Sequence, residues 1–362
     1  MTSPPEDIDW HSFLGRPPLP SLARNALSYL SRDPILITGA GGSIGSALSR
    51  RLVKSGCKVI TLEASESNLY ELDKQLRGAS ARGAVRMYLG DAGDSALLAE
   101  IFGEYRPQVV FHAAAFKHLP LLEQQPLAAI ANNVSVTKAV ADKASEHGAR
   151  VVLLSTDKVV TPSSVMGASK QVAEQIVLAC GGNVVRLANV LGSRGSVSEV
   201  FAGQIAAGES LTLTDAAAER YFLTVKEAVE LLLAAGVDAN GGAILVPDLK
   251  KAHRIGELAR FMEKVLAPGG EVRIEFTKLR AGEKLTELLW GADEKAIADP
   301  ARGMVRIEPQ TWRRESIDDR LRLLISNVER RDVAGAIAAL RELVPDYVAS
   351  ATVLDIGTGR HE

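Results

Sequence analysis

Hydroxyl groups, an acid and a base stand side by side in Ser155, Thr156, Asp157 and Lys158. The four residues before them, 151–154, are apolar and include two β-branched valines, which predicts a buried strand. In an open α/β sheet, ligands bind beyond the carboxyl ends of the strands. We therefore expect this polar cluster to be a catalytic centre for acid–base chemistry.

A glycine-rich stretch between a predicted strand, 35–38, and a predicted helix, 46–53, could bind a phosphate group. Glycines let the backbone approach a pyrophosphate, and the helix N-terminus supplies free N–H groups and a favourable dipole. A simple tight turn is the alternative, which the strand–turn–helix context disfavours. The residues of this loop predicted to contact a dinucleotide are Gly39, Gly41, Gly42, Ser43, Ile44 and Gly45.

The strand predicted next, 58–62, ends at Glu63, about where an acid would bind the ribose 2′-hydroxyl of a dinucleotide. Because an acid there repels a 2′-phosphate, the sequence favours NAD over NADP. Asp91 ends the following strand and could contact the adenine ring or cap the helix expected to begin near Ser95; the spacing leaves both open. The small residues that follow strand 108–112, and leave room for a cofactor, are Ala113, Ala114 and Ala115.

Polar residues near that strand divide into core residues and site candidates. We expect His112 to be a hydrogen-bonded core residue rather than a ligand, and we consider Lys117 and His118, at the mouth of the presumed cleft, better site candidates. The amides of Asn132 and Asn133 lie in an apolar run. Buried amides need partners, so these two could tie the sheet together near the active site.

Met166 and Lys170 occupy the Tyr-x-x-x-Lys spacing of a short-chain-dehydrogenase-like site. One helical turn would bring a tyrosine hydroxyl beside the lysine ammonium, which lowers the tyrosine pKa enough for it to act as a base. Methionine cannot take a proton, so a degenerate, non-catalytic protein is the alternative. The acid and base at 157 and 158 argue against that alternative, because an inert sheet has little use for them.

Strand and helix patterns alternate through six units, which predicts a doubly wound parallel sheet of the α/β class. We expect a lead-in over 1–32 with a packing or linker role, and a dinucleotide-binding domain with the catalytic residues over 33–192. A smaller, mainly substrate-binding lobe should cover 193–310, and a helical extension 311–362. The helices predicted within these regions are 68–77, 96–104, 127–147, 168–179, 226–236, 255–266, one opening at 278–285, and 325–343. The stretch 184–192 is predicted to be one strand and its exit loop.

The smaller lobe is richer in exposed arginine and lysine, which suits closure over an anionic substrate. Its candidates for diphosphate contacts are Arg194, Arg220, Arg280 and Lys284, each of which could instead be a solvated surface charge.

Composition excludes several classes of function. The 362 residues are 46% hydrophobic and 24% charged with a net charge of -2, which is ordinary for a soluble globular protein and provides no basic field for nucleic acid. Cys57 and Cys180 lack metal-ligand spacing and are expected to be reduced thiols. The sequence shows neither a membrane span nor a signal peptide, so we expect a cytoplasmic protein.

The order and combination of these motifs resemble the UDP-N-acetylglucosamine 4,6-dehydratases, the polysaccharide-biosynthesis branch of the extended short-chain dehydrogenases. Methionine in place of tyrosine is similar to the long, membrane-attached members, and we expect this protein to be a soluble form without their membrane domain. Three departures concern residues near the substrate: Ala281 replaces a proline, Ser164 an asparagine and Ala188 a glycine. The segments that carry the resemblance, which covers roughly 13–290, are 38–45, 112–118, 155–158, 165–170, 189–197 and 279–285.

The resemblance implies a Rossmann fold with bound NAD that takes a hydride from sugar C4 and returns it to C6, so that water is lost without net redox. Lys158 would take the C5 proton, Asp157 would protonate the departing 6-hydroxyl, and Thr156 would hydrogen-bond the C4 oxygen. Lys170 would hold the nicotinamide ribose, and a bound water or Asp157 could remove the C4 hydroxyl proton in place of a tyrosine at Met166.

The predicted binding residues follow. For NAD they are the glycine loop with Glu63, Asp91, Ala92, Ala113, Ala114, Ala115, Lys117, Asn132, Ser155 and Lys170. For the UDP-sugar they are Lys117, His118, Asn189, Arg194, Val197, Arg220, Arg280, Glu283 and Lys284.

Two other interpretations remain open at this point: an epimerase that acts through a 4-keto intermediate, and a non-catalytic NAD-binding protein. We expect no metal, no nucleic acid and no membrane partner. Assembly into a homo-oligomer is implied by the resemblance alone.

Overall fold

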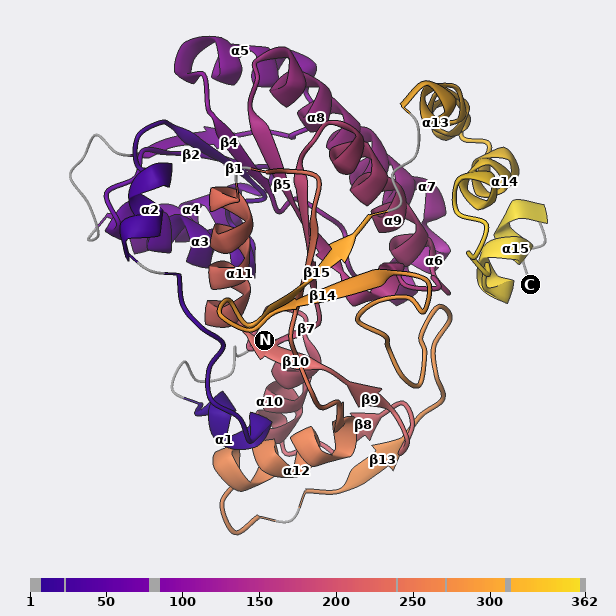
Figure 1. Cartoon of the computed structure of the whole chain (residues 1–362). Coiled ribbons are helices and arrows are strands. Elements are labelled where there is room, and N and C mark those ends of the chain that lie inside the picture. Colours follow the sequence, from indigo (N-terminus) through magenta and orange to yellow (C-terminus); the bar gives the residue numbers. More distant parts are fainter. Residues whose placement is uncertain are drawn as a thin grey trace.

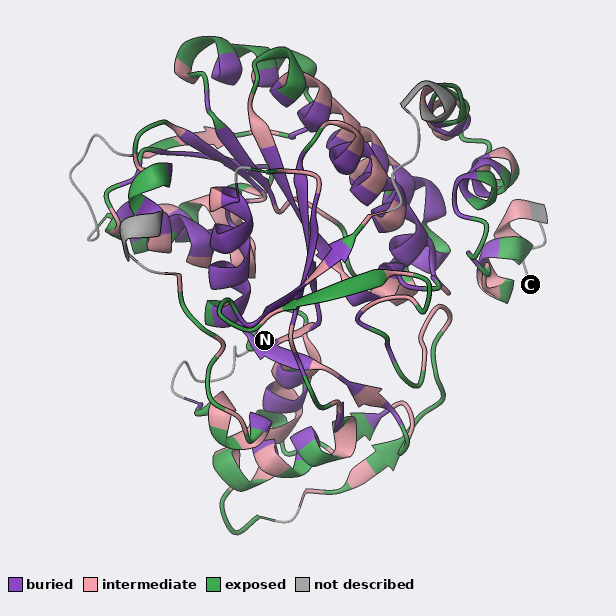
Figure 2. Cartoon of the chain, in the orientation of Figure 1, coloured by how far each residue is buried: buried purple, intermediate pink, exposed green. Residues whose placement is uncertain are grey.

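Buried parallel strands form the centre of the computed structural model, which describes residues 8–22, 24–77, 85–238, 240–270, 272–309 and 314–358. Every residue of the inner strands β1, β4 and β6, and of β2 and β11, is buried. Strands covered on both faces need continuous apolar sequence, which is why these segments are rich in Val, Ile and Leu. Figure 2 shows this buried centre between more exposed outer layers.

The described residues form a nine-stranded main sheet. Its strands pair in parallel from β3 to β11, whereas β15 pairs antiparallel with both β11 and β14. The predicted doubly wound parallel sheet is therefore confirmed, with an antiparallel hairpin added at one edge. In spatial order the strands are β14 (Lys295–Asp299), β15 (Met304–Glu308), β11 (Ile244–Pro247), β6 (Asn183–Leu187), β5 (Arg150–Thr156), β4 (Val109–His112), β1 (Ile35–Thr38), β2 (Val59–Glu63) and β3 (Val85–Leu89).

Two groups of helices cover the two faces of the sheet (Figure 1). Members of each group contact one another, as α11 does α3 and as α8 does α9. One group is α2 (Arg24–Leu30), α3 (Ser43–Lys54), α4 (Glu66–Leu76) and α11 (Val225–Val237). The other is α5 (Ser95–Tyr105), α6 (Leu119–Gln124), α7 (Pro126–Ile130), the π-helix η1 (Ala131–Ser135), α8 (Val136–Glu146) and α9 (Val165–Ala179).

A smaller lobe lies below the carboxyl ends of the parallel strands in Figure 1. It has its own apolar core, in which Phe201, Leu211 and Leu258 are fully buried. The N-terminal helix α1 (Trp10–Leu14) adds Leu14 to this core, so part of the predicted lead-in packs against the lobe. The remaining elements are α10 (Val197–Ala207), α12 (Ile255–Leu266), and the strand pairs β7 (Asn189–Leu191) with β10 (Phe222–Thr224), β8 (Leu211–Leu213) with β13 (Ile274–Phe276), and β9 (Glu219–Arg220) with β12 (His253–Arg254).

The C-terminal helices α13 (Arg314–Glu329), α14 (Val333–Leu343) and α15 (Ala351–Thr358) lie on the outer side of α6, α7 and α9. Their buried residues join those of α7 and α9 in one apolar cluster. The predicted helix 325–343 is wrong as a single element: Arg331 has φ +59°, and the Asp332 side chain caps α14. The predicted boundary at 311 lies outside the described residues.

Other predicted elements also differ from the structure. Helix 127–147 is interrupted by η1, and α9 begins at Val165 rather than at 168, because Ser164 caps it there. The stretch 184–191 is two strands, since the chain leaves the main sheet at Ala188 and β7 pairs with β10. No helix opens at 278–285, where Gly282 has φ +79° in a turn.

The hairpin β14–β15 was not predicted. It and β11 belong to the main sheet although they fall within 193–310, the stretch assigned mainly to the substrate lobe. The residues of β14 are largely exposed, so the alternation that marks a half-buried strand is missing. Across the described part of the chain, no helix is both long and apolar enough to cross a membrane.

Candidate active site

The predicted acid and base stand together at the carboxyl end of β5. A short 3-10 turn, η2 (Asp157–Val159), follows the strand. The Lys158 Nζ donates to Asp157 Oδ1 over 2.9 Å and to Asn189 Oδ1 over 3.1 Å. The Thr156 hydroxyl donates to the same Asp157 oxygen over 3.0 Å. Asp157 is buried, and among the described residues its Oδ2 has no hydrogen-bond partner.

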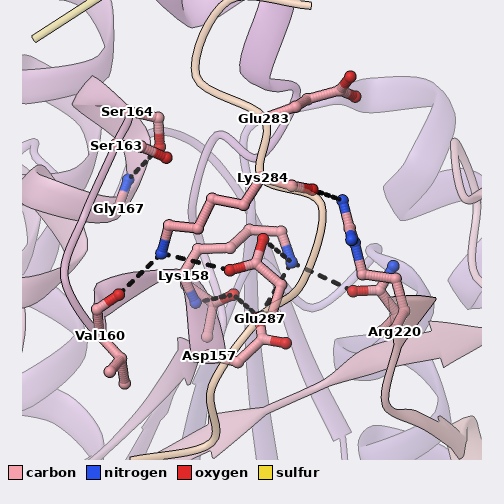
Figure 3. Close-up of polar contacts among 12 residues, drawn as sticks. Asp157, Lys158, Val160, Ser163, Ser164, Gly167, Arg220, Glu283, Lys284 and Glu287 are labelled. Atoms are coloured by element: carbon pink, nitrogen blue, oxygen red, sulfur yellow. Dashed lines mark hydrogen bonds and ion pairs between the residues drawn. The ribbon is translucent and has the colours of Figure 1, made fainter. Parts of the chain in front are cut away.

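A segment of the chain far from β5 closes over this pair. The Lys284 Nζ donates to the Val160 carbonyl over 2.8 Å. The buried carboxylate of Glu287 lies between the two lysines, 3.8 Å from Lys158 Nζ and 3.4 Å from Lys284 Nζ (Figure 3). Two carboxylates and the amino groups of two lysines thus form one cluster.

Arg220 holds this segment in place. Its guanidinium donates to the carbonyls of Leu285 and Lys284 over 2.8 and 2.7 Å. Arg220 is 9% exposed, so these are buried, charge-assisted hydrogen bonds. The structure therefore gives Arg220 a role in shaping the site, and its predicted contact with a diphosphate stays a prediction.

Helix α9 carries Lys170, the second residue of the Tyr-x-x-x-Lys spacing. The Ser164 side chain caps the helix by accepting the Gly167 N–H over 3.1 Å. Met166 is buried in the apolar cluster under the C-terminal helices. Lys170 is 3% exposed, and its Nζ has no hydrogen-bond partner within the described residues. Burial lowers the pKa of Lys170 to about 8. A buried ammonium without an acceptor fits a ligand that supplies hydroxyl oxygens, as a ribose does.

Close backbone contacts leave no room for side chains at two positions of the glycine loop. A Cβ on Gly39 would lie 2.6 Å from the Ala114 nitrogen, and one on Gly45 would lie 2.2 Å from the Gly39 carbonyl oxygen. Gly39 also has φ +65°. Helix α3 begins after Gly42 without a side-chain cap, so its first N–H groups remain for an anion. The predicted residues Ser43 and Ile44 open this helix.

Glu63 ends β2 beside this loop. Its carboxylate accepts the Gly41 N–H over 2.8 Å and the Ser65 N–H over 3.0 Å. Each carboxylate oxygen can accept a further hydrogen bond, so the position remains compatible with a ribose hydroxyl. The predicted ribose contact stays a prediction.

One alternative for Asp91 is wrong. Asp94, not Asp91, caps α5, by accepting the N–H groups of Ala96 and Leu97. Asp91 instead accepts the Gly93 N–H over 2.7 Å, and Ala92 beside it is buried. The adenine contact therefore remains as the predicted role of Asp91.

The prediction that His112 is a core residue is confirmed, and the partners of the two asparagines lie in the loop after β4 and in α9. His112 is a core residue: Nδ1 lies 2.6 Å from the Thr38 hydroxyl, Nε2 lies 3.0 Å from the Thr137 hydroxyl, and burial lowers its pKa to about 3. Asn132 and Asn133 both accept the Phe116 N–H over 2.9 Å.

Asn133 also donates to the Ser169 hydroxyl over 3.1 Å, which ties the loop after β4 to α9. The residues Ala113, Ala114 and Ala115 lie in that loop, each partly exposed.

Arg194 lies against the glycine loop. Its backbone N–H donates to the Ser43 hydroxyl over 2.9 Å, and its guanidinium contacts the Gly41 carbonyl and Asn68 Oδ1. The Lys117 Nζ donates to the Arg194 carbonyl over 2.5 Å. Arg194 therefore lies on the dinucleotide side of the cleft, where the sequence predicted a substrate contact in the smaller lobe.

The remaining substrate candidates lie in separate segments of the chain. His118 faces Gly195, so that a Cβ there would lie 2.3 Å from the ring. Arg280 is exposed and pairs with Glu283 through its Nε over 2.9 Å. Val197 begins α10 and packs on the core of the smaller lobe.

Ser155 is directed at a buried ion pair. Its hydroxyl donates to Glu174 Oε1 over 2.6 Å, and Arg186 donates to both oxygens of the same carboxylate. This pair fixes α9 against β5 and β6, and a cofactor contact of Ser155 stays a prediction.

Glu287 and Glu123 are not among the residues predicted from the sequence. Glu123 is buried, accepts the Val165 N–H over 2.8 Å and the Ser350 hydroxyl over 2.6 Å, and burial raises its pKa. It thereby links the C-terminal extension to the start of α9. The one signal for Glu287 is an acid three residues after Lys284 among leucines, which is too common to single it out.

The fold and this site define a Rossmann-type α/β protein with a smaller lobe over the sheet's carboxyl edge. Residues 35–309 match the family described as "Polysaccharide biosynthesis protein", and the chain belongs to that family. It is 38% identical over 298 residues to the capsular polysaccharide biosynthesis protein CapD of Staphylococcus aureus, covering 79% of this chain and 50% of that protein. The chain thus spans about half the length of the first curated relatives it matches.

Other relatives have different names. The UDP-glucose 4-epimerase of Rickettsia rickettsii is 34% identical over 287 residues, covering 75% of this chain and 82% of that protein. Pen from Bacillus thuringiensis matches with a TM-score of 0.72 and 27% identity over 78% of this chain and 89% of Pen. The dTDP-glucose 4,6-dehydratase DesIV of Streptomyces venezuelae, solved with NAD bound, has a TM-score of 0.61 and 22% identity over 72% and 88%.

Proposed function

We propose that this protein is an NAD-dependent 4,6-dehydratase acting on UDP-N-acetylglucosamine or a close UDP-hexose. The observation that best supports this proposal is the pair of Asp157 and Lys158 at the end of β5. The Asp157 Oδ2 has no hydrogen-bond partner among the described residues. Oxidation at C4 alone needs no acid–base pair beyond the group that handles the C4 hydroxyl. Loss of water across C5 and C6 needs both a base and an acid.

NAD fits the residues present. The uncapped start of α3 would hold the pyrophosphate, Glu63 the adenosine ribose and Lys170 the nicotinamide ribose. When bound, NAD would accept a hydride from C4 of the sugar and return it to C6. NAD-bound relatives such as DesIV support this assignment.

The elimination itself would be performed by side chains of this chain. With C4 in the ketone form, the C5 proton is acidic, and Lys158, in its neutral amine form, takes it. Lys158 returns this proton to C5 when the hydride is delivered to C6. The electrons of the C5–H bond form the C5–C6 double bond, and the C6–O bond breaks. Asp157 donates its proton to the departing hydroxyl, which leaves as water. Thr156, which donates to Asp157 in this structure, would turn its hydroxyl to the C4 oxygen.

Met166 leaves the C4 hydroxyl without a tyrosine base. The buried Met166 side chain has no group that takes a proton, and Asp157 Oδ2, at the end of β5, is an acceptor without a partner among the described residues. We assign removal of the C4 hydroxyl proton to Asp157. This role leaves Asp157 protonated, which is the form it needs to act as the acid at C6.

Incubation with UDP-N-acetylglucosamine and mass spectrometry of the product tests the proposal. We expect a product lighter by one water. When the reaction is run in D₂O, deuterium at C5 reports the return of a proton, and the hydrogens at C6 report the return of the hydride. A product of unchanged mass with an altered sugar NMR spectrum would contradict dehydration.

A UDP-sugar 4-epimerase is the second candidate, because curated UDP-glucose 4-epimerases are among the relatives. The same incubation distinguishes it by the unchanged mass. A protein that binds NAD tightly but turns over none of the UDP-hexoses would be non-catalytic.

A further inference from the structure

We infer that Glu287 is a positioning residue for the proposed dehydration, stabilising the ammonium that forms when Lys158 takes the C5 proton. The inference rests on the proposed function, and nothing in the sequence assigned Glu287 a role. Its geometry is the first reason. The carboxylate is 2% exposed and lies 3.8 Å from Lys158 Nζ, close enough to attract a charge there but too far to be a hydrogen bond.

Glu287 is held by anchors on both sides. Upstream, Arg220 binds the carbonyls of Lys284 and Leu285, and the Glu219 N–H also donates to Leu285. Downstream, Leu289 is buried in the main core. The backbone that carries Glu287 is therefore fixed on both sides, which favours electrostatic stabilisation of Lys158 with little reorganisation.

Among the groups around Lys158, Glu287 is the one that can stabilise the ammonium by its charge. The groups that face the Lys158 amine are Asp157 from its own turn, Asn189 from β7, and Glu287 from the segment 284–289. Before the elimination, Asp157 carries the proton that it will donate, so it is neutral. Glu287 is then the anion nearest to Lys158, and its own charge is balanced by Lys284 at 3.4 Å.

In serine hydrolases, a buried carboxylate stabilises the cation that forms on the histidine base beside it. Glu287 would act on Lys158 in the same way. The carboxylate touches neither the departing water nor the C5 proton, and it acts through Lys158. The smaller lobe would then contribute to the chemical step as well as to substrate binding. Figure 3 shows Glu287 reaching between the two lysines from that lobe segment.

The test compares Glu287→Gln, which keeps the volume and removes the charge, with Glu287→Asp, which keeps the charge on a shorter side chain. Glu275→Gln is the matched control, since Glu275 is exposed on β13 of the same lobe. We expect Glu287→Gln to lower kcat by about 10- to 100-fold with KM changed less than about 3-fold. Glu287→Asp should fall between it and the parent, and Glu275→Gln should match the parent.

Two readouts separate positioning from a structural effect. A substrate deuterated at C5 should show a larger kinetic isotope effect on kcat in Glu287→Gln, because proton abstraction becomes slower relative to other steps. Reductive methylation of Lys158, followed by peptide mass spectrometry, should be several-fold faster in the same variant, because the amine loses an ion-pair partner. This second readout does not require turnover.

The results test the role of Glu287 separately from the proposed dehydratase activity. An active parent with an unchanged kcat or isotope effect in Glu287→Gln would overturn it, as would a loss confined to KM. If the parent turns over no UDP-hexose, the proposed function fails, and the methylation rate alone decides whether Glu287 holds Lys158. An unchanged rate then overturns the inference. If Glu287→Gln does not fold, the same comparisons are made with Glu287→Asp.

Discussion

The glycine loop and the acid–base cluster are assembled in opposite ways. The loop and its acid lie within residues 39–63, and its geometry comes from close backbone contacts such as that of Gly45 with the Gly39 carbonyl. The cluster joins residues that are far apart, such as Lys284 and Val160, 124 positions away in the sequence.

This difference predicts different failures. A local motif fails when one added atom does not fit, and the effect falls on binding of the cofactor. The acid–base cluster is damaged when a charged group loses its partner, and we expect the rate of the chemical step to fall. Variants that damage one region and spare the other therefore test whether the two are separate.

Lys158→Ala should have the largest effect. Removing the base should lower kcat by about 10³-fold or more, because general-base catalysis contributes about 10²- to 10⁴-fold and Asp157 also loses its partner. NAD binding, measured by calorimetry, should be unchanged. If NAD binding is lost together with activity, Lys158 belongs to the cofactor region and the assigned role is wrong.

Lys170→Met should affect stability and binding in opposite directions. Burial lowers the pKa of Lys170 to about 8, whereas a lysine in the unfolded chain titrates near about 10.4. The unfolded chain thus holds more protons between these values, so the cost of burying the charge is complete below pH 8 and is relieved as pH rises through the interval.

The variant should therefore be more stable at pH 7 by roughly 3 kcal/mol at most, while binding NAD more weakly. The gain should shrink above pH 8. Chemical denaturation of the apo protein at pH 7 and pH 10 measures it, and an equal gain at both values would contradict the assigned cause.

Gly45→Ala should damage the local region alone. The new Cβ would meet the Gly39 carbonyl oxygen at 2.2 Å, so the loop must shift. Overpacking of this kind costs about 1–3 kcal/mol, and NAD affinity should fall with it. Gly103→Ala in α5 is the control, since nothing lies within 4 Å of its Cβ. Thermal unfolding and NAD titration of both variants give the comparison, and equal NAD affinities would refute the close-approach argument.

Arg280→Ala should have the smallest effect. Arg280 is exposed and paired only with Glu283 in the described structure, so its loss should barely alter stability. If it binds the diphosphate, KM for the UDP-sugar should rise about tenfold, as for loss of one charge-assisted hydrogen bond, with kcat little changed. Steady-state kinetics with the sugar nucleotide measures both, and an unchanged KM would remove Arg280 from the substrate site.

Much of the main sheet was predictable because parallel strands covered on both faces need unbroken apolar runs. Residues 35–38 and 151–154 carry that signal and lie in β1 and β5. The hairpin β14–β15 carried no such signal, because β14 is exposed at the edge of the sheet. The break at Arg331 was equally hidden, because its left-handed backbone falls on a residue other than glycine.

The candidate site also has parts that were predictable from the sequence and parts that were not. The sequence by itself determined the glycine loop, the neighbouring Glu63 and the order Thr156, Asp157, Lys158, since each depends on residues close together in the chain. Only the tertiary structure decided that Arg194 lies on the glycine loop and that Glu287 faces Lys158. The physical reason is that charges interact through space, and a pattern of sequence neighbours does not reveal which distant segment brings the second carboxylate.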